Sequence, residues 1–239
     1  MAEDANLPVG EGGRIGVEAF LRQVAATPLR VRSPGGRGRL VFAMDATASR
    51  QPTWDHASQL QGEMFETTVA LGGLDIQLVY FRGYRECRAG PWLSCAPDLL
   101  RLMAKVQCLA GQTQWLRVFG HAISETKREK VGALICVGDA FEESVDDVGA
   151  LAGELGLLGV PAFMFHEGQD AEARRAFQFL ARLSGGAYCQ FDRAGARQLR
   201  DLLSAVAVFA AGGRAALDDF SNGRGGLARL LTDQMGSGR

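Results

Sequence analysis

The length and charge of this chain exclude several classes of protein. Its 239 residues, 47% of them apolar, suffice for one well-buried domain with modest extensions, so no second full domain is needed. Basic and acidic residues nearly cancel, at 26 against 27, which predicts no general electrostatic binding to nucleic acid or to an anionic membrane. No apolar stretch approaches the roughly 18 residues of a membrane span.

Short apolar runs alternate with longer amphipathic segments along most of the chain. We expect residues 1–38 to form an extension with a short helix at 17–26 and a Gly/Pro-rich joint, and residues 214–239 to form a tail with a short docking helix at 227–235. Strands are expected at 40–44, 75–81, 87–93, 131–137, 161–165 and 188–191, and helices at 52–71, 96–109, 114–125, 143–158, 172–183 and 194–211. Pro91 restricts the third strand to an edge or a turn.

This alternation predicts an α/β domain over residues 39–213. Helices that alternate with short apolar strands build a central, mostly parallel sheet flanked by helices, in three layers. The run at 40–44 is apolar throughout, as expected of a strand that is covered on both faces.

Three polar patches stand at the ends of these elements. They are Asp45-Ala46-Thr47-Ala48-Ser49, Gly111-Gln112-Thr113 and Gly138-Asp139. The first and third follow buried strands, and the carboxyl ends of parallel strands form one rim along which ligands bind. We therefore expect the two carboxylates to meet there. Each patch alone is also typical of a helix cap or a turn, and Thr113 could cap the helix that follows it.

The side chains at this rim would be hard oxygen donors. Two carboxylates and three hydroxyls come from Asp45, Thr47, Ser49, Thr113 and Asp139. Mg²⁺ prefers oxygen ligands and commonly takes only one or two protein carboxylates, so it is the expected cation, ahead of Mn²⁺ or Ca²⁺. Zinc is disfavoured because the patches contain no Cys or His. Arg50 and Trp54 follow the first patch closely enough to border a binding surface.

The order of these patches resembles the metal-ion-dependent adhesion site (MIDAS) of von Willebrand factor A (VWA) domains, of the bacterial intracellular type. The resemblance covers roughly residues 39–213 and includes the alternation of strands and helices. It implies that Thr47, Ser49 and Thr113 contact the cation, while Asp45 and Asp139 balance its charge, partly through water. The sequence departs from the family in having Thr47 in place of the usual first Ser, Gly138 where Thr is commoner, and Ala140 in place of Gly.

A Mg²⁺-dependent phosphatase of the haloacid-dehalogenase type is the alternative. Asp45 would be its nucleophile, and Gly138-Asp139 with Glu143 resembles its acidic motif. That chemistry needs a carboxylate two positions after the nucleophile to donate and accept protons, and Thr47 stands there. The sequence therefore favours a protein that is not an enzyme.

The function expected from these residues is cation-dependent protein binding. Two carboxylates leave an open position on Mg²⁺, which a partner's Asp or Glu can fill. By analogy with intracellular VWA proteins, the partner would belong to a stress-response or chaperone-like assembly with an ATPase. No nucleic acid or membrane partner is expected.

The cysteines indicate a cytoplasmic protein. They are Cys87, Cys95, Cys108, Cys136 and Cys189, an odd number with no Cys-x-x-Cys pair, which is typical of free thiols. Residues 1–13 lack the basic start and apolar core of an export signal.

Overall fold

The computed structural model describes residues 37–51, 54–55, 73–191 and 196–223. The helices expected at 17–26 and 227–235, and all of the one at 52–71 except residues 54 and 55, lie outside this part. The domain boundaries at 38 and 214 therefore stay predictions. All five cysteines are free thiols. Among the described residues, no helix has both the length and the apolar character to cross a membrane.

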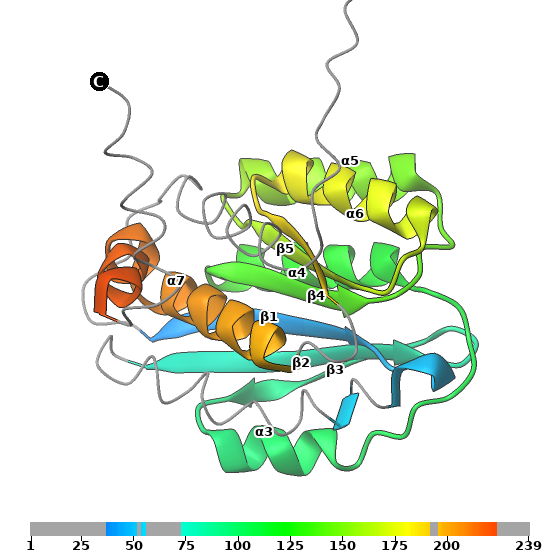
Figure 1. The fold of residues 1–239 in the computed structure, drawn as a ribbon, viewed down its shortest axis with the longest axis horizontal. Coiled ribbons are helices and arrows are strands. Elements are labelled where there is room, and N and C mark those ends of the chain that lie inside the picture. Colours follow the sequence, from blue (N-terminus) through cyan, green and yellow to red (C-terminus); the bar gives the residue numbers. More distant parts are fainter. Residues whose placement is uncertain (1–36, 52–53, 56–72, 192–195, 224–239) are drawn as a thin grey trace, which may run out of the picture.

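In the described part, six strands form one sheet in the order β3-β2-β1-β4-β5-β6 (Figure 1). Every neighbouring pair is parallel except β2 with β3. This confirms the predicted α/β class with a mostly parallel sheet. The strands are β1 (Gly38–Asp45), β2 (Leu74–Arg82), β3 (Glu86–Leu93), β4 (Ala133–Gly138), β5 (Ala162–Glu167) and β6 (Tyr188–Phe191).

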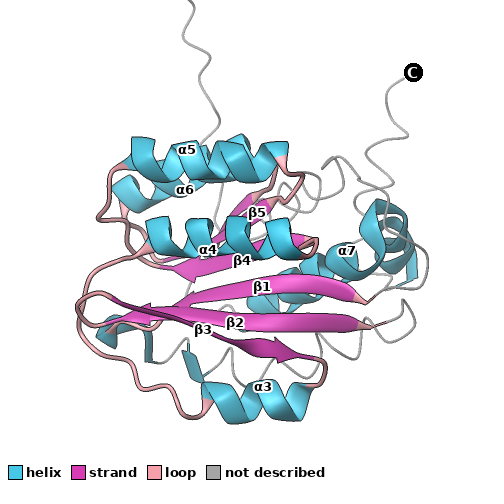
Figure 2. Ribbon diagram, turned by 180° about the vertical axis from the view of Figure 1, so that it is seen from behind, coloured by secondary structure: helices cyan, strands magenta, loops and turns pink. Residues whose placement is uncertain are grey.

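Helices cover both faces of the sheet and complete three layers (Figure 2). Alternate residues of β1 explain the two cores: Leu40, Phe42 and Met44 pack on one face, and Val41 and Ala43 on the other. The first face lies under α3 (Ala96–Met103) and α7 (Ala196–Gly223), and the second under α4 (Trp115–Arg128), α5 (Val145–Leu157) and α6 (Ala171–Ser184).

Local signals in the sequence set the ends of the helices on the second face. Ser144 precedes α5 and its side chain accepts a hydrogen bond from the Asp147 amide, while Asp170 caps α6 through the Ala173 amide. Gly185 ends α6 in the left-handed conformation, with a φ of 72°, which a residue with a side chain adopts only at a cost.

Two helix ends differ from the sequence prediction. Helix α3 ends at Met103 and not near residue 109, because the following segment turns back to the carboxyl end of β1, where the Leu109 amide donates to the Ala46 carbonyl over 3.0 Å. Helix α7 continues beyond residue 211 to Gly223, across a break at Gly213, whose φ is 71°. Glycine permits this break, so the chain re-enters a helix in a new direction.

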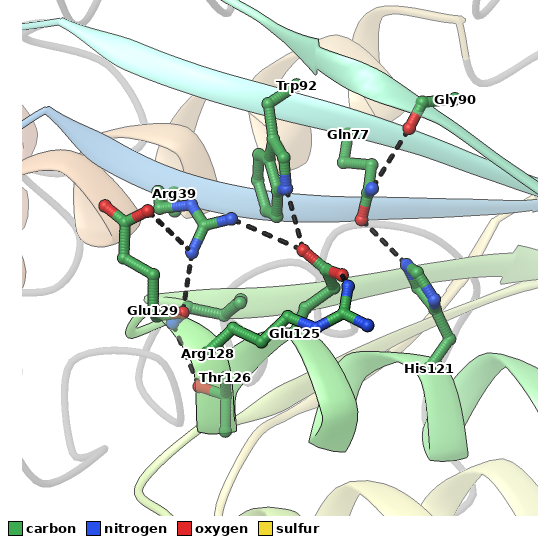
Figure 3. A network of polar contacts seen from close by, with 10 residues as sticks. Arg39, Gln77, Gly90, Trp92, His121, Glu125, Thr126, Arg128 and Glu129 are labelled. Atoms are coloured by element: carbon green, nitrogen blue, oxygen red, sulfur yellow. Dashed lines mark hydrogen bonds and ion pairs between the residues drawn. The ribbon is translucent and has the colours of Figure 1, made fainter.

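The third strand is an edge strand, as Pro91 predicted, and a buried polar network ties it to the rest of the domain (Figure 3). The Arg39 guanidinium of β1 lies 3.8 Å from the centre of the Trp92 ring of β3. Both side chains reach Glu125 of α4, with Trp92 Nε1 at 2.8 Å and Arg39 Nη2 at 3.4 Å from Oε2. The carboxylate therefore joins β1, β3 and α4.

A second path of polar contacts runs beside it. His121 Nε2 of α4 lies 2.8 Å from Gln77 Oε1 of β2, and Gln77 Nε2 donates to the Gly90 carbonyl of β3 over 3.0 Å (Figure 3). Burial lowers the pKa of His121 and so favours its neutral ring.

Removal of the Glu125 carboxylate should destabilise the domain. Burial raises the pKa of Glu125, but the Trp92 hydrogen bond and the nearby cations outweigh it and leave the pKa below its ordinary value. Glu125→Ala leaves the buried Arg39 with only the exposed carboxylate of Glu129 as its acidic partner and removes the acceptor of Trp92 Nε1, which together cost about 3 kcal/mol of unfolding free energy in chemical denaturation. Glu154→Ala, which removes the exposed partner of Lys127, is the control and should cost less than about 1 kcal/mol. Equal losses in the two variants would contradict the role of the network.

Candidate metal centre

A cavity of about 280 Å³ lies at the carboxyl ends of β1 and β4. Parallel pairing sets Met44 opposite Val137, so two carboxylates stand at this edge: Asp45 is the last residue of β1, and Asp139 directly follows β4. All the predicted ligands line the cavity, together with one residue that sequence reasoning missed: Asp45, Thr47, Ser49, Thr113, Asp139 and Glu142.

The first polar patch folds into a compact turn. Asp45 is fully buried at the end of β1, and its Oδ1 accepts a hydrogen bond of 2.7 Å from the Thr47 amide. Ala48–Arg50 then form a 3-10 helix, for which Thr47 makes no side-chain cap. The two hydroxyls of the patch therefore remain available to the cavity: Thr47 Oγ1 lies 3.4 Å from Ser49 Oγ, which donates to Asp139 Oδ2 over 2.9 Å.

The second and third patches hold each other through paired hydrogen bonds. The Thr113 amide donates to Glu142 Oε2, and the Glu142 amide donates to Thr113 Oγ1, each over 2.9 Å. Thr113 does not cap α4, because Gln114 is the N-cap residue, and the Gln114 side chain makes no capping hydrogen bond to the helix. The Glu143 carboxylate caps that helix by accepting from the Trp115 and Leu116 amides.

Packing explains why Gly138 stands where the VWA family more often has Thr. A Cβ at this position would lie 2.5 Å from Cζ2 of Trp115. The indole is fully buried and donates from Nε1 to the Ala140 carbonyl over 3.1 Å. Trp115 thus occupies the space of the missing side chain and holds the loop that carries Asp139.

The charge of the buried carboxylate at the centre is only partly compensated by its neighbours. Burial raises the pKa of Asp45 to about 6, an effect that the neighbouring Asp139 increases and that the Thr47 amide and Arg50 partly oppose. Asp45 Oδ2 is buried and has no hydrogen-bond partner among the residues that the structure describes. A cation in the cavity would give this buried oxygen a positively charged partner, so the residues present fit a hard divalent cation.

Hydroxyls would have to complete the coordination. Nowhere among the described residues do three or more His, Cys, Asp or Glu side chains form a metal-holding group. The set at this cavity is instead mixed, with carboxylates from Asp45 and Asp139 beside hydroxyls from Thr47, Ser49 and Thr113.

Arg50 and Trp54 do not border this cavity, so that prediction is wrong. Their exposed fractions are 1% and 2%. Trp54 Nε1 donates to the Met103 carbonyl over 3.2 Å, and Arg50 pairs with Glu167 inside the domain. Both side chains are packed inside the domain, and no short sequence pattern reports that direction.

A larger cavity of about 650 Å³ lies between the start of α5 and α6. Its lining mixes Phe141 and Phe179 with acidic residues and with Arg175 and Arg182. Because apolar, acidic and basic side chains are mixed in this lining, it does not indicate one class of ligand.

Solved structures identify the architecture. No family model matches the sequence, and no curated protein matches it significantly. A von Willebrand factor type A structure from Catenulispora acidiphila aligns at a TM-score of 0.60 and 15% identity, over 72% of this chain and 43% of the other. This chain has the fold of a VWA domain.

Two further VWA-fold structures agree. Proximal thread matrix protein 1 from the mussel byssus, with a zinc-occupied MIDAS motif, aligns at a TM-score of 0.58 and 15% identity, over 74% of this chain and 47% of the other. The SpRpn10 VWA domain aligns at 0.54 and 10% identity, over 70% of this chain and 94% of the other. The chain therefore spans less than half of the first two structures, and at these identities the likeness concerns the fold.

Proposed function

We propose that this VWA-fold chain is a divalent-cation-dependent protein-binding module, with Mg²⁺ as its cation. The observation that carries the proposal is the cavity in which Asp45, with its unpartnered oxygen, meets Asp139 and three hydroxyls. The mussel protein, whose structure is described as having zinc in its MIDAS motif, supports a divalent cation in this fold. Mn²⁺, Ca²⁺ and Zn²⁺ are the competitors to compare.

Each residue has a distinct role in this proposal. Thr47, Ser49 and Thr113 offer neutral hydroxyl oxygens, while Asp45 and Asp139 supply the negative charge. The bound cation would act as a Lewis acid that accepts a carboxylate oxygen from outside the chain. Glu142 accepts from the Thr113 amide and so holds that hydroxyl against the loop of Asp139.

The proposed partner is a protein that presents an exposed Asp or Glu. We propose a cytoplasmic setting, in keeping with the free thiols, and an assembly of the stress-response or chaperone type that contains an ATPase. Other solved structures that align with this chain are described as a pilus adhesin and a COPII-coat protein.

Capture of the partner tests this function. Tagged full-length protein is incubated with lysate in Mg²⁺ or in EDTA, and the retained proteins are identified. We expect Mg²⁺-dependent capture that Ser49→Ala reduces at least about tenfold, because it removes a hydroxyl at the cation. Ser124→Ala removes a hydroxyl that bonds within α4, and it should capture as wild type does. Capture that is equal in EDTA would contradict the proposal.

We expect no phosphatase activity. The Thr47 hydroxyl does not titrate near neutrality, and among the described residues that line the cavity none is basic and able to bind a phosphate. Turnover of p-nitrophenyl phosphate in Mg²⁺ should equal that of the buffer. Robust turnover that Asp45→Asn abolishes would instead establish the enzyme, with Asp45 as its nucleophile.

A further inference from the structure

A buried ion pair lies directly behind the first polar patch. The Arg50 guanidinium contacts the Glu167 carboxylate at the end of β5, and the two side chains are only 1% and 4% exposed. Burial of two charges costs several kcal/mol for each ion, so such a pair is seldom a net gain for the fold. Within the described part of the chain, Arg50 Nε and Nη2 are also buried without hydrogen-bond partners. A contribution to folding stability therefore does not explain why the Arg50 side chain is buried here.

The position of Arg50 connects it to the cavity. It follows Ser49 directly, and its amide donates to the Thr47 carbonyl over 2.9 Å, which closes the turn between the two hydroxyls. The other end of the same patch is anchored on the sheet, where the Ala46 amide donates to the Phe81 carbonyl over 2.9 Å. The side chain of Arg50 thus supplies the second anchor, on β5, 117 residues away.

The opposite charges of Arg50 and Glu167 cancel next to a cavity that must accept a cation. A lone Arg50 beside Asp45 would favour the ionised carboxylate but would also repel an incoming Mg²⁺. Glu167 offsets that positive charge inside the domain. The pair therefore fixes the turn without adding net positive charge behind the cavity.

We infer that Arg50 and Glu167 form a positioning pair, which holds Thr47 and Ser49 in the geometry that binds the cation. The inference rests on the proposed function, since it concerns the same site. The pair touches neither the cation nor the partner, and acts through the 3-10 helix at Ala48–Arg50. Residues of this kind commonly alter metal affinity by roughly 10- to 100-fold.

An apolar replacement separates positioning from stability. Arg50→Met/Glu167→Leu removes both charges of the pair, so the melting temperature should equal or exceed that of the wild type. Mn²⁺ affinity, measured from the electron paramagnetic resonance of the free ion, should fall roughly 10- to 100-fold. Arg39→Met/Glu125→Leu replaces the buried pair between β1 and α4 and is the matched control, which should keep Mn²⁺ affinity within about twofold.

Single variants make the test independent of folding in the double variant. Arg50→Lys keeps the charge with fewer donors and should bind Mn²⁺ between the wild type and the apolar pair. Wild-type Mn²⁺ affinity in a folded Arg50→Met/Glu167→Leu protein, or in Arg50→Lys if the double variant does not fold, would overturn the inference. If the wild type itself binds no Mn²⁺, both the proposed function and the positioning role are wrong. If Ser49→Ala weakens Mn²⁺ binding but the Arg50 and Glu167 variants do not, the metal site stands and only the positioning role is wrong.

Discussion

Replacement of Asp45 by asparagine should raise the melting temperature of the cation-free protein at pH 7.5 and abolish its response to Mg²⁺. Burial, with help from Asp139, raises the pKa of Asp45 from 3.8 to about 6. The folded state therefore binds more protons than the unfolded state between these values. The stability from this group is full below about pH 4 and is lost as pH rises through about 6.

At pH 7.5 the ionised Asp45 thus costs the cation-free protein up to about 3 kcal/mol, and asparagine removes most of this cost. Its side-chain oxygen can still accept from the Thr47 amide, as Oδ1 of Asp45 does. Because the amide carries no charge, Mg²⁺ no longer gains a carboxylate at the buried end of the cavity.

Thermal melting in EDTA and in Mg²⁺, at pH 5 and pH 7.5, checks both effects. We expect Asp45→Asn to exceed the wild type in EDTA at pH 7.5, by a margin that shrinks at pH 5, and Mg²⁺ to stabilise the wild type alone. Asp147→Asn changes an exposed carboxylate of α5 and should melt as the wild type does. A fall in melting temperature for Asp45→Asn in EDTA would show that its carboxylate is balanced without a cation.

Substitution of Gly138 by threonine, the residue commoner in the VWA family, should destabilise this protein by at least about 2 kcal/mol. The new Cβ would meet Cζ2 of Trp115 at 2.5 Å. The indole cannot retreat, because the rings of Phe81 and Phe177 pack against it with centroids at 4.8 and 5.4 Å.

Chemical denaturation of single and double variants isolates this contact. Trp115→Phe should cost less in the Gly138→Thr background than in the wild type, because the smaller ring admits the new side chain. Gly120→Ala is the control, since a Cβ there meets no atom within 4 Å and alanine favours the helix. A Gly138→Thr protein as stable as the wild type would show that Trp115 does not determine this position.

The sequence predicted the architecture because a strand that is buried on both faces must be apolar throughout. Residues 40–44 met that condition, so the place of Asp45 at the rim followed from the end of the run. The edge strand followed from Pro91, which cannot donate to a neighbouring strand. Helix α3 was predicted too long, because its end depends on the contact between Leu109 and Ala46, which are far apart in sequence.

Side-chain direction was the part that sequence patterns could not supply. Glu142 follows Asp139 by three residues and directly precedes the helix predicted at 143–158, yet its carboxylate accepts from the Thr113 amide of another loop. The burial of Arg50 depends on Glu167, which only the parallel sheet brings near. The ligand roles of the predicted residues stay predictions, whereas their meeting in one cavity is a property of the fold.

Crystals soaked in Mn²⁺ test the central claim most directly. Anomalous diffraction at the manganese edge locates the ion without reference to activity or to a partner. We expect one strong peak in the cavity at the ends of β1 and β4, within about 2.0–2.6 Å of oxygens from Ser49 and at least one of Thr47 and Thr113. Full occupancy elsewhere on the chain, or no peak in the cavity at millimolar Mn²⁺, would contradict the account.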